Sequence, residues 1–154
     1  MEEGRGRLLP GTAGMTLLVC EDGNEYTERF QRFLGAEFHF LRATHFAEIL
    51  KALPEARALL LDLDFRRTDP ALLVDESGAP AGRDLAEVQG ILILHALRSR
   101  GVTLPALLFA DLDDDARKAR LEKDLAPLQI VPSGEGLLRI AQRLRESTDQ
   151  QRHR

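Results

Sequence analysis

The chain has 154 residues, of which 44% are hydrophobic and only 5% aromatic, and its formal net charge is −4 at pH 7. This length suits one domain with its own core, and the acidic balance argues against a general nucleic-acid binder, which needs a basic face. The single Cys20 excludes an internal disulfide, and no run reads as a signal peptide or a membrane span, so we expect a cytoplasmic protein.

Apolar runs of strand length alternate with amphipathic stretches along the first half of the chain. Before them, residues 1–14 carry no periodic pattern and predict a disordered lead-in, and Met15 offers an alternative start. The predicted elements are, in order, a strand at 16–20, a helix at 24–34 with Tyr26, Phe30, Phe33 and Leu34 on its buried stripe, an edge strand at 37–41, a helix at 44–54 and a strand at 58–63.

A long irregular segment, at about 65–83, follows the third strand and contains two prolines and two glycines. Loops of this length are uncommon and often functional. We favour a role as a lid or a partner-binding loop over a tolerated insertion, because the apolar residues 71–74 inside it need cover. After it, the pattern predicts a helix at 85–100, a strand at 104–110, a helix at 114–125, a strand at 128–131, a helix at 136–145 and a polar tail from 147.

Five strand–helix units in strict alternation predict an α/β fold, with a parallel sheet covered by helices on both faces. Among doubly wound arrangements the five-stranded order 2-1-3-4-5 fits best. That order places the first, third and fourth strands side by side at the centre of the sheet.

Acidic residues follow each of these three central strands: Glu21 and Asp22 the first, Asp62 and Asp64 the third, and Asp111 the fourth. Parallel strands bring their carboxyl ends to one edge, where open α/β folds keep their sites. Carboxylates crowded there raise each other's pKa unless a cation lies among them. The pattern therefore predicts a small oxygen-ligated metal site, or the remains of one.

Each of these acids also has a simpler interpretation. Glu21 and Asp22 are suited to capping the following helix, since acids favour a helix N-terminus. Asp62 is equally interpretable as a solvated acid at the end of a strand. Asp111 and the acids after it are typical of the start of a helix, and the histidines show no ligand spacing.

The segment 15–146 resembles the receiver domain of bacterial response regulators, the CheY-like fold. The resemblance lies in the acidic pair Glu21-Asp22 and in Asp62 within Leu-Leu-Leu-Asp-Leu-Asp, with weaker matches at Gly90, Ala110 and Pro132. It implies that Asp62 is the phosphoacceptor. It also implies that Mg²⁺ is held by Glu21, Asp22 and Asp62 together with the backbone carbonyl of Asp64.

The sequence departs from the receiver pattern at the groups that contact the phosphoryl oxygens. Phe109 stands where a Thr or Ser is expected (Ala110, one position on, also lacks a hydroxyl), and Val131 stands where the family has Lys. Arg66, Arg67 and Arg83 on the long loop are the candidates to replace that lysine. Losing two charge-assisted hydrogen bonds weakens stabilisation by roughly 10²-fold or more, so the departures favour a pseudo-receiver.

The expected function is that of a stand-alone signalling module that acts through protein contacts, with phosphorylation weak or absent and Mg²⁺ binding optional. The resemblance implies a histidine kinase or a downstream signalling protein as partner, and a homodimer face formed by the fourth helix, fifth strand and last helix. A phosphorylatable regulator using Asp62 is the first alternative. A Mg²⁺-dependent phosphatase of the haloacid-dehalogenase type, suggested by Asp62-Leu63-Asp64, is the second. A nucleotide-binding module is disfavoured, because no Gly-rich loop follows the first strand.

Overall fold

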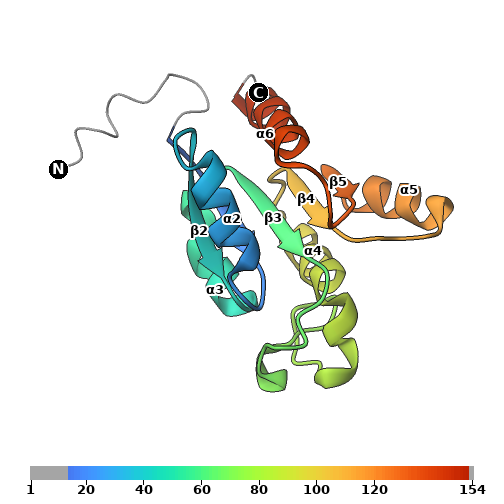
Figure 1. The fold of residues 1–154 in the computed structure, drawn as a ribbon. Helices are drawn as coiled ribbons and strands as arrows, with labels where there is room; N and C mark the ends of the chain where they lie inside the picture. The colour runs from blue at the N-terminus through green and yellow to red at the C-terminus, as the bar shows by residue number, and fades with distance from the viewer. Residues whose placement is uncertain (1–13, 153–154) are drawn as a thin grey trace.

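The central sheet of the computed structural model, which describes residues 14–152, has five parallel strands in the order β2-β1-β3-β4-β5 (Figure 1). This confirms the predicted order and places β1, β3 and β4 side by side. The register aligns Asp62 with Phe109, and Phe109 with Val131. The strands are β1 (Met15–Cys20), β2 (Phe38–Ala43), β3 (Ala58–Asp62), β4 (Ala106–Phe109) and β5 (Leu128–Val131).

Helices cover both faces of the sheet. Successive strand residues point to opposite faces, so Leu60 packs beneath α2 and α6, whereas Leu59 and Leu61 pack on the opposite side with α3 and α4. All three leucines are fully buried, as a strand covered on both faces requires. No helix within 14–152 combines the length and the apolar content of a membrane span. The helices are α2 (Glu25–Leu34), α3 (Phe46–Ala52), α4 (Gln89–Ser99), α5 (Asp115–Asp124) and α6 (Leu137–Arg152).

Two helix boundaries differ most from the prediction. The helix expected at 85–100 begins only at Gln89, because the preceding Arg83–Val88 form a 3₁₀ helix whose Ala86 carbonyl accepts a hydrogen bond from Phe65. The last helix extends to Arg152, through most of the predicted polar tail, since no Gly or Pro interrupts that stretch. The predicted lead-in lies, apart from its last residue, outside the described residues.

The segment between β3 and α4, residues 65–88 (here called the insertion), is fastened to the body of the domain. Phe65 and Leu73 are buried in the core. The Gln89 side chain is also buried, and it both donates to the Val74 carbonyl and accepts from the Val74 N–H, each at 2.9 Å. An amide side chain thus pairs with the backbone as a neighbouring strand would. Leu73 and Val74 pack back as predicted, whereas Leu72 remains 41% exposed.

Candidate functional site

Four acidic residues gather at the edge where β1 and β3 end. Glu21 and Asp22 follow β1, Asp62 is the last residue of β3, and Asp64 lies two residues further on. The charges of Asp22, Glu21 and Asp64 all act on Asp62, so the predicted convergence of distant acids is present. Each carboxylate nevertheless has its own partner, and the partners determine what the edge can do.

Asp62 is half-buried and lies at the centre of this group. Its Oδ1 accepts a hydrogen bond from the Leu63 N–H at 2.9 Å. Burial, together with the neighbouring charges of Asp22, Glu21 and Asp64, raises the pKa of Asp62 to about 6 against the opposing effect of the Leu63 hydrogen bond. Asp62 therefore takes up a proton at a mildly acidic pH at which an ordinary surface aspartate is ionised.

We expect Asp62→Asn to stabilise the protein above pH 6 and not at about pH 4. The pKa of Asp62 rises from 3.8 to about 6 on folding, so the stabilisation from its proton is full below about pH 3.8 and is lost as the pH rises through about 6. Asparagine does not titrate, so the variant does not lose this stabilisation. We expect Asp62→Asn to raise the free energy of unfolding above pH 6 by about 1 kcal/mol, after allowance for solvent screening of a partly exposed group. Urea unfolding of both proteins across this pH range measures it. A gain that does not change with pH, or an equal gain in Asp64→Asn, contradicts the assignment.

Glu21 is committed to the start of α2. Its side chain is buried, with 1% exposed. One carboxylate oxygen accepts from the Tyr26 N–H at 3.1 Å, and the other accepts from the Thr27 N–H at 2.8 Å and the Thr27 hydroxyl at 2.7 Å. Asn24, the residue at the cap position, makes no capping bond with its side chain. Glu21 therefore satisfies two free N–H groups of the first helical turn, which is the capping role that the sequence left open for it.

Asp22 is bound by an arginine from the insertion. The Arg67 backbone N–H donates to Asp22 Oδ2 at 2.8 Å, and its guanidinium donates to Asp22 Oδ1 at 3.1 Å. The same guanidinium donates to both oxygens of Glu25, at 2.9 and 3.0 Å. The hydrogen bonds from Arg67 lower the pKa of Glu25 to about 2. The sequence proposed Arg67 only as a partner for phosphate, and it gave no signal for Glu25, which looks like an ordinary first-turn acid.

Asp64 is held within its own loop. Its Oδ1 accepts from the Arg66 N–H at 2.9 Å, and its Oδ2 lies 2.7 Å from the Arg66 guanidinium. That guanidinium also lies 3.6 Å from Glu87 near the end of the insertion. Arg66 thus links Asp64, the residue before the insertion, to Glu87 near the end of the insertion. The contact with Mg²⁺ predicted for the Asp64 carbonyl stays a prediction.

Two apolar side chains lie in register with Asp62, Phe109 on β4 and Val131 on β5. They are 2% and 1% exposed and belong to the core under α2 and α6. The Tyr26 ring stacks on Phe109 with its centroid 4.8 Å away and its plane inclined by 20°. Phe109 is therefore the neighbour of Asp62 across the sheet and Val131 lies one strand further, and neither side chain has the hydroxyl or ammonium group that receivers carry at these positions.

The carboxylates of this edge do not fit a shared metal ion as they are arranged. Both carboxylate oxygens of Glu21 accept hydrogen bonds from α2, and both carboxylate oxygens of Asp22 accept hydrogen bonds from Arg67. Within residues 14–152, no three side chains of the acidic, histidine or cysteine type are placed to hold one ion. The assignment of Mg²⁺ to Glu21, Asp22, Asp62 and Asp64 stays a prediction, and it requires Arg67 to move away first.

Asp111, after β4, belongs to a different contact. Its carboxylate accepts hydrogen bonds from the N–H and the hydroxyl of Ser133, and these bonds lower its pKa. It therefore joins the loop after β4 to the loop after β5. The start of α5 is capped instead by Asp114, whose Oδ1 accepts from the N–H groups of Ala116 and Arg117.

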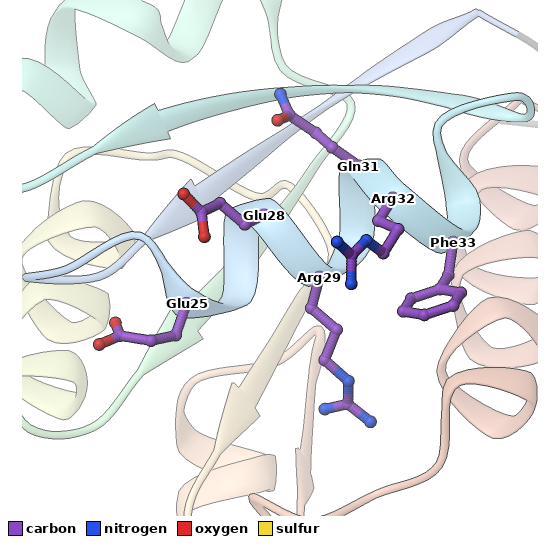
Figure 2. Close-up of a pocket in the computed structure, with 6 residues that line it drawn as sticks. All are labelled: Glu25, Glu28, Arg29, Gln31, Arg32 and Phe33. Carbon is purple, nitrogen blue, oxygen red and sulfur yellow. The ribbon is translucent and has the colours of Figure 1, made fainter.

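The outer face of α2 borders a wide, shallow hollow of about 620 Å³ (Figure 2). Phe33, predicted on the buried stripe, is 60% exposed, and the Arg32 guanidinium lies 5.9 Å from its ring centre. The buried stripe instead passes through Thr27 and Phe30, so that Phe33 falls at its solvent edge. The lining side chains are Glu25, Glu28, Arg29, Gln31, Arg32 and Phe33.

No protein-family model matches the chain, and no curated protein matches it. Several solved structures, in contrast, match the fold of the chain. The receiver domain of the Francisella response regulator 1452 is 13% identical, with 90% of this chain and 99% of that chain covered and a TM-score of 0.67. The BeF₃-activated N-terminal receiver domain of Klebsiella pneumoniae RstA is 18% identical, with 86% and 97% covered and a TM-score of 0.60. A two-component response regulator from Clostridium difficile is 10% identical, with 86% and 93% covered and a TM-score of 0.60. The chain therefore has the receiver-domain fold over nearly its whole length.

Proposed function

Given the receiver-domain fold that it shares with these structures, we propose that the chain is a signalling module that works through protein contacts, with phosphorylation of Asp62 weak or absent. The observation that carries this proposal is the pair of buried hydrocarbon side chains, Phe109 and Val131, in register with Asp62. Neither can neutralise or hydrogen-bond a phosphoryl oxygen.

The charges around Asp62 support the same conclusion. Phosphoryl transfer is catalysed mainly by cationic and hydrogen-bonding groups that stabilise charge on the equatorial oxygens. Asp62 has instead the negative charges of Asp22, Glu21 and Asp64 around it. Arg67, the nearby cation, already forms hydrogen bonds with Asp22 and Glu25. A phosphoryl group on Asp62 would thus add negative charge beside the carboxylates of Asp22, Glu21 and Asp64, with Arg67 already engaged.

The surface formed by α5, β5 and α6 is the docking face that we propose for a histidine kinase, for a downstream signalling protein or for a second copy of the chain. The α5 helix has no buried side chain. Leu138, in the first turn of α6, is 87% exposed, which is unusual for a large apolar residue. A contact made through this face needs no change at Asp62.

Incubation with Mg²⁺ and acetyl phosphate, followed by intact-mass measurement, tests the phosphorylation half of the proposal. We expect the mass to stay unchanged, because the groups that would stabilise the transition state are missing at Phe109 and Val131. The Klebsiella RstA receiver domain serves as the positive control in the same reaction. A phosphoryl adduct that forms on this chain and is lost in Asp62→Asn contradicts the proposal and favours the phosphorylatable alternative.

A further inference from the structure

A cation already lies at the acidic edge, and it is the side chain of Arg67. Arg67 donates to Asp22 through its guanidinium and its backbone N–H, and to Glu25 through two guanidinium nitrogens. A planar guanidinium that meets a carboxylate through two parallel hydrogen bonds is the geometry in which arginine binds best. These contacts join the insertion to the N-terminus of α2 across more than forty positions of sequence.

Gly23 leaves the space that the guanidinium occupies. A Cβ built on Gly23 would collide with the Nη2 and Cζ atoms of Arg67 and with the Glu25 carboxylate. The Gly23 carbonyl also accepts a hydrogen bond from Arg42 of β2. Two arginines, Arg42 and Arg67, therefore contact the loop between β1 and α2. The Arg67 guanidinium lies against Gly23, the one residue of this loop that has no side chain.

We propose that Arg67 is the resident cation of this edge: it occupies the carboxylate that a divalent ion would need and fastens the insertion to α2, so that a metal ion binds only when Arg67 is removed. The inference does not depend on the docking role proposed above. Arg67 thereby explains why the edge, although rich in acids, does not fit the metal ion that receiver domains bind.

Arg66 provides a matched control for Arg67. It is the preceding residue, its side chain is similarly exposed (67% against 60%), and it also pairs with two carboxylates. Its partners, Asp64 and Glu87, lie beside or within the insertion rather than on the loop after β1. Removing Arg66 therefore removes the same charge without freeing Asp22.

The experiment is a titration of the ¹⁵N-labelled protein with Mn²⁺, which broadens the amide signals near its binding site. We expect no selective broadening at Asp22 and Asp62 in the wild-type chain or in Arg66→Ala, and clear broadening at both in Arg67→Ala. Hydrogen exchange at the amides of the insertion is expected to accelerate more in Arg67→Ala than in Arg66→Ala, because Arg67, unlike Arg66, joins the insertion to α2.

Selective broadening in the wild-type chain overturns the proposal, because the ion then binds with Arg67 in place. The absence of broadening in Arg67→Ala overturns it as well, because something other than Arg67 then excludes the ion. Gly23→Ala provides a second route that leaves the charge intact: its methyl group displaces the guanidinium, so it should behave like Arg67→Ala. The Mn²⁺ titration contains no phosphoryl donor, so it reports ion binding by itself, and its outcome can be told apart from that of the acetyl-phosphate labelling.

Discussion

Gly90→Ala is expected to lower the free energy of unfolding by about 2 kcal/mol, because the new methyl group has no space. A Cβ at Gly90 would collide with the carbonyl oxygen of Asp62 and lie 3.0 Å from the Leu63 Cα. The Gly90 N–H donates to the Leu63 carbonyl at 3.0 Å, so the first turn of α4 cannot withdraw without breaking that bond. Forced overpacking costs about 3 kcal/mol at the upper end, which exceeds the gain of about 1 kcal/mol from replacing glycine within a helix.

The matched control is Gly134→Ala, because a Cβ there meets nothing within 4 Å. We expect its stability to change by less than about 0.5 kcal/mol. Urea unfolding followed by circular dichroism measures both variants. Equal stability of the two would show that α4 does not press on the end of β3 as described. In that case the position of Asp62 is not fixed by this contact.

Glu21→Ala is expected to destabilise the protein by about 3 kcal/mol, since it leaves three donors without a partner, two of them buried and one part-buried. These donors are the N–H of Tyr26 and the N–H and hydroxyl of Thr27. Two effects oppose the loss: the variant removes a negative charge close to Asp62, and water can enter the space left behind. We expect the lost hydrogen bonds to dominate, because each buried unsatisfied donor alone costs about 1–3 kcal/mol.

Glu28→Ala is the control for Glu21→Ala. Glu28 lies on the same helix but is exposed, and it accepts a single hydrogen bond from Asn24 at 2.8 Å. Its removal should change the stability by no more than about 0.5 kcal/mol. A small effect of Glu21→Ala, close to that of Glu28→Ala, would mean that Glu21 does not hold the start of α2.

The strands and their order could be predicted because burial on both faces leaves a direct mark on the sequence. The fully apolar run at 58–61 predicts a central strand, and strict alternation with helices leaves few arrangements of the sheet. The ends of the helices and strands were harder to predict. In the 3₁₀ helix at Arg83–Val88, the Ala86 carbonyl accepts a hydrogen bond from the Phe65 N–H. A contact between residues so far apart leaves no periodic pattern in the sequence.

The site could be predicted in its position but not in its partners. Acids at the ends of β1 and β3 had to share an edge once the order was known. Which of them would cap a helix and which would bind a cation depends on the path of the insertion. The pairing of Arg67 with Asp22 and Glu25 follows from that path, over a separation of 45 and 42 residues. Phe109 and Val131, in contrast, were identified by position alone, and the register pairs Phe109 with Asp62 and Val131 with Phe109.

The most direct test of the account is a comparison of amide spectra of the wild-type chain before and after addition of Mg²⁺ with beryllofluoride, a mimic of the phosphoryl group. We expect no new signals for Asp62 and no shifts across α5, β5 and α6, because Phe109 and Val131 offer no polar group and Arg67 holds Asp22. New signals at Asp62 that are lost in Asp62→Asn, accompanied by shifts along α5 and β5, would contradict it and show a working phosphoryl switch.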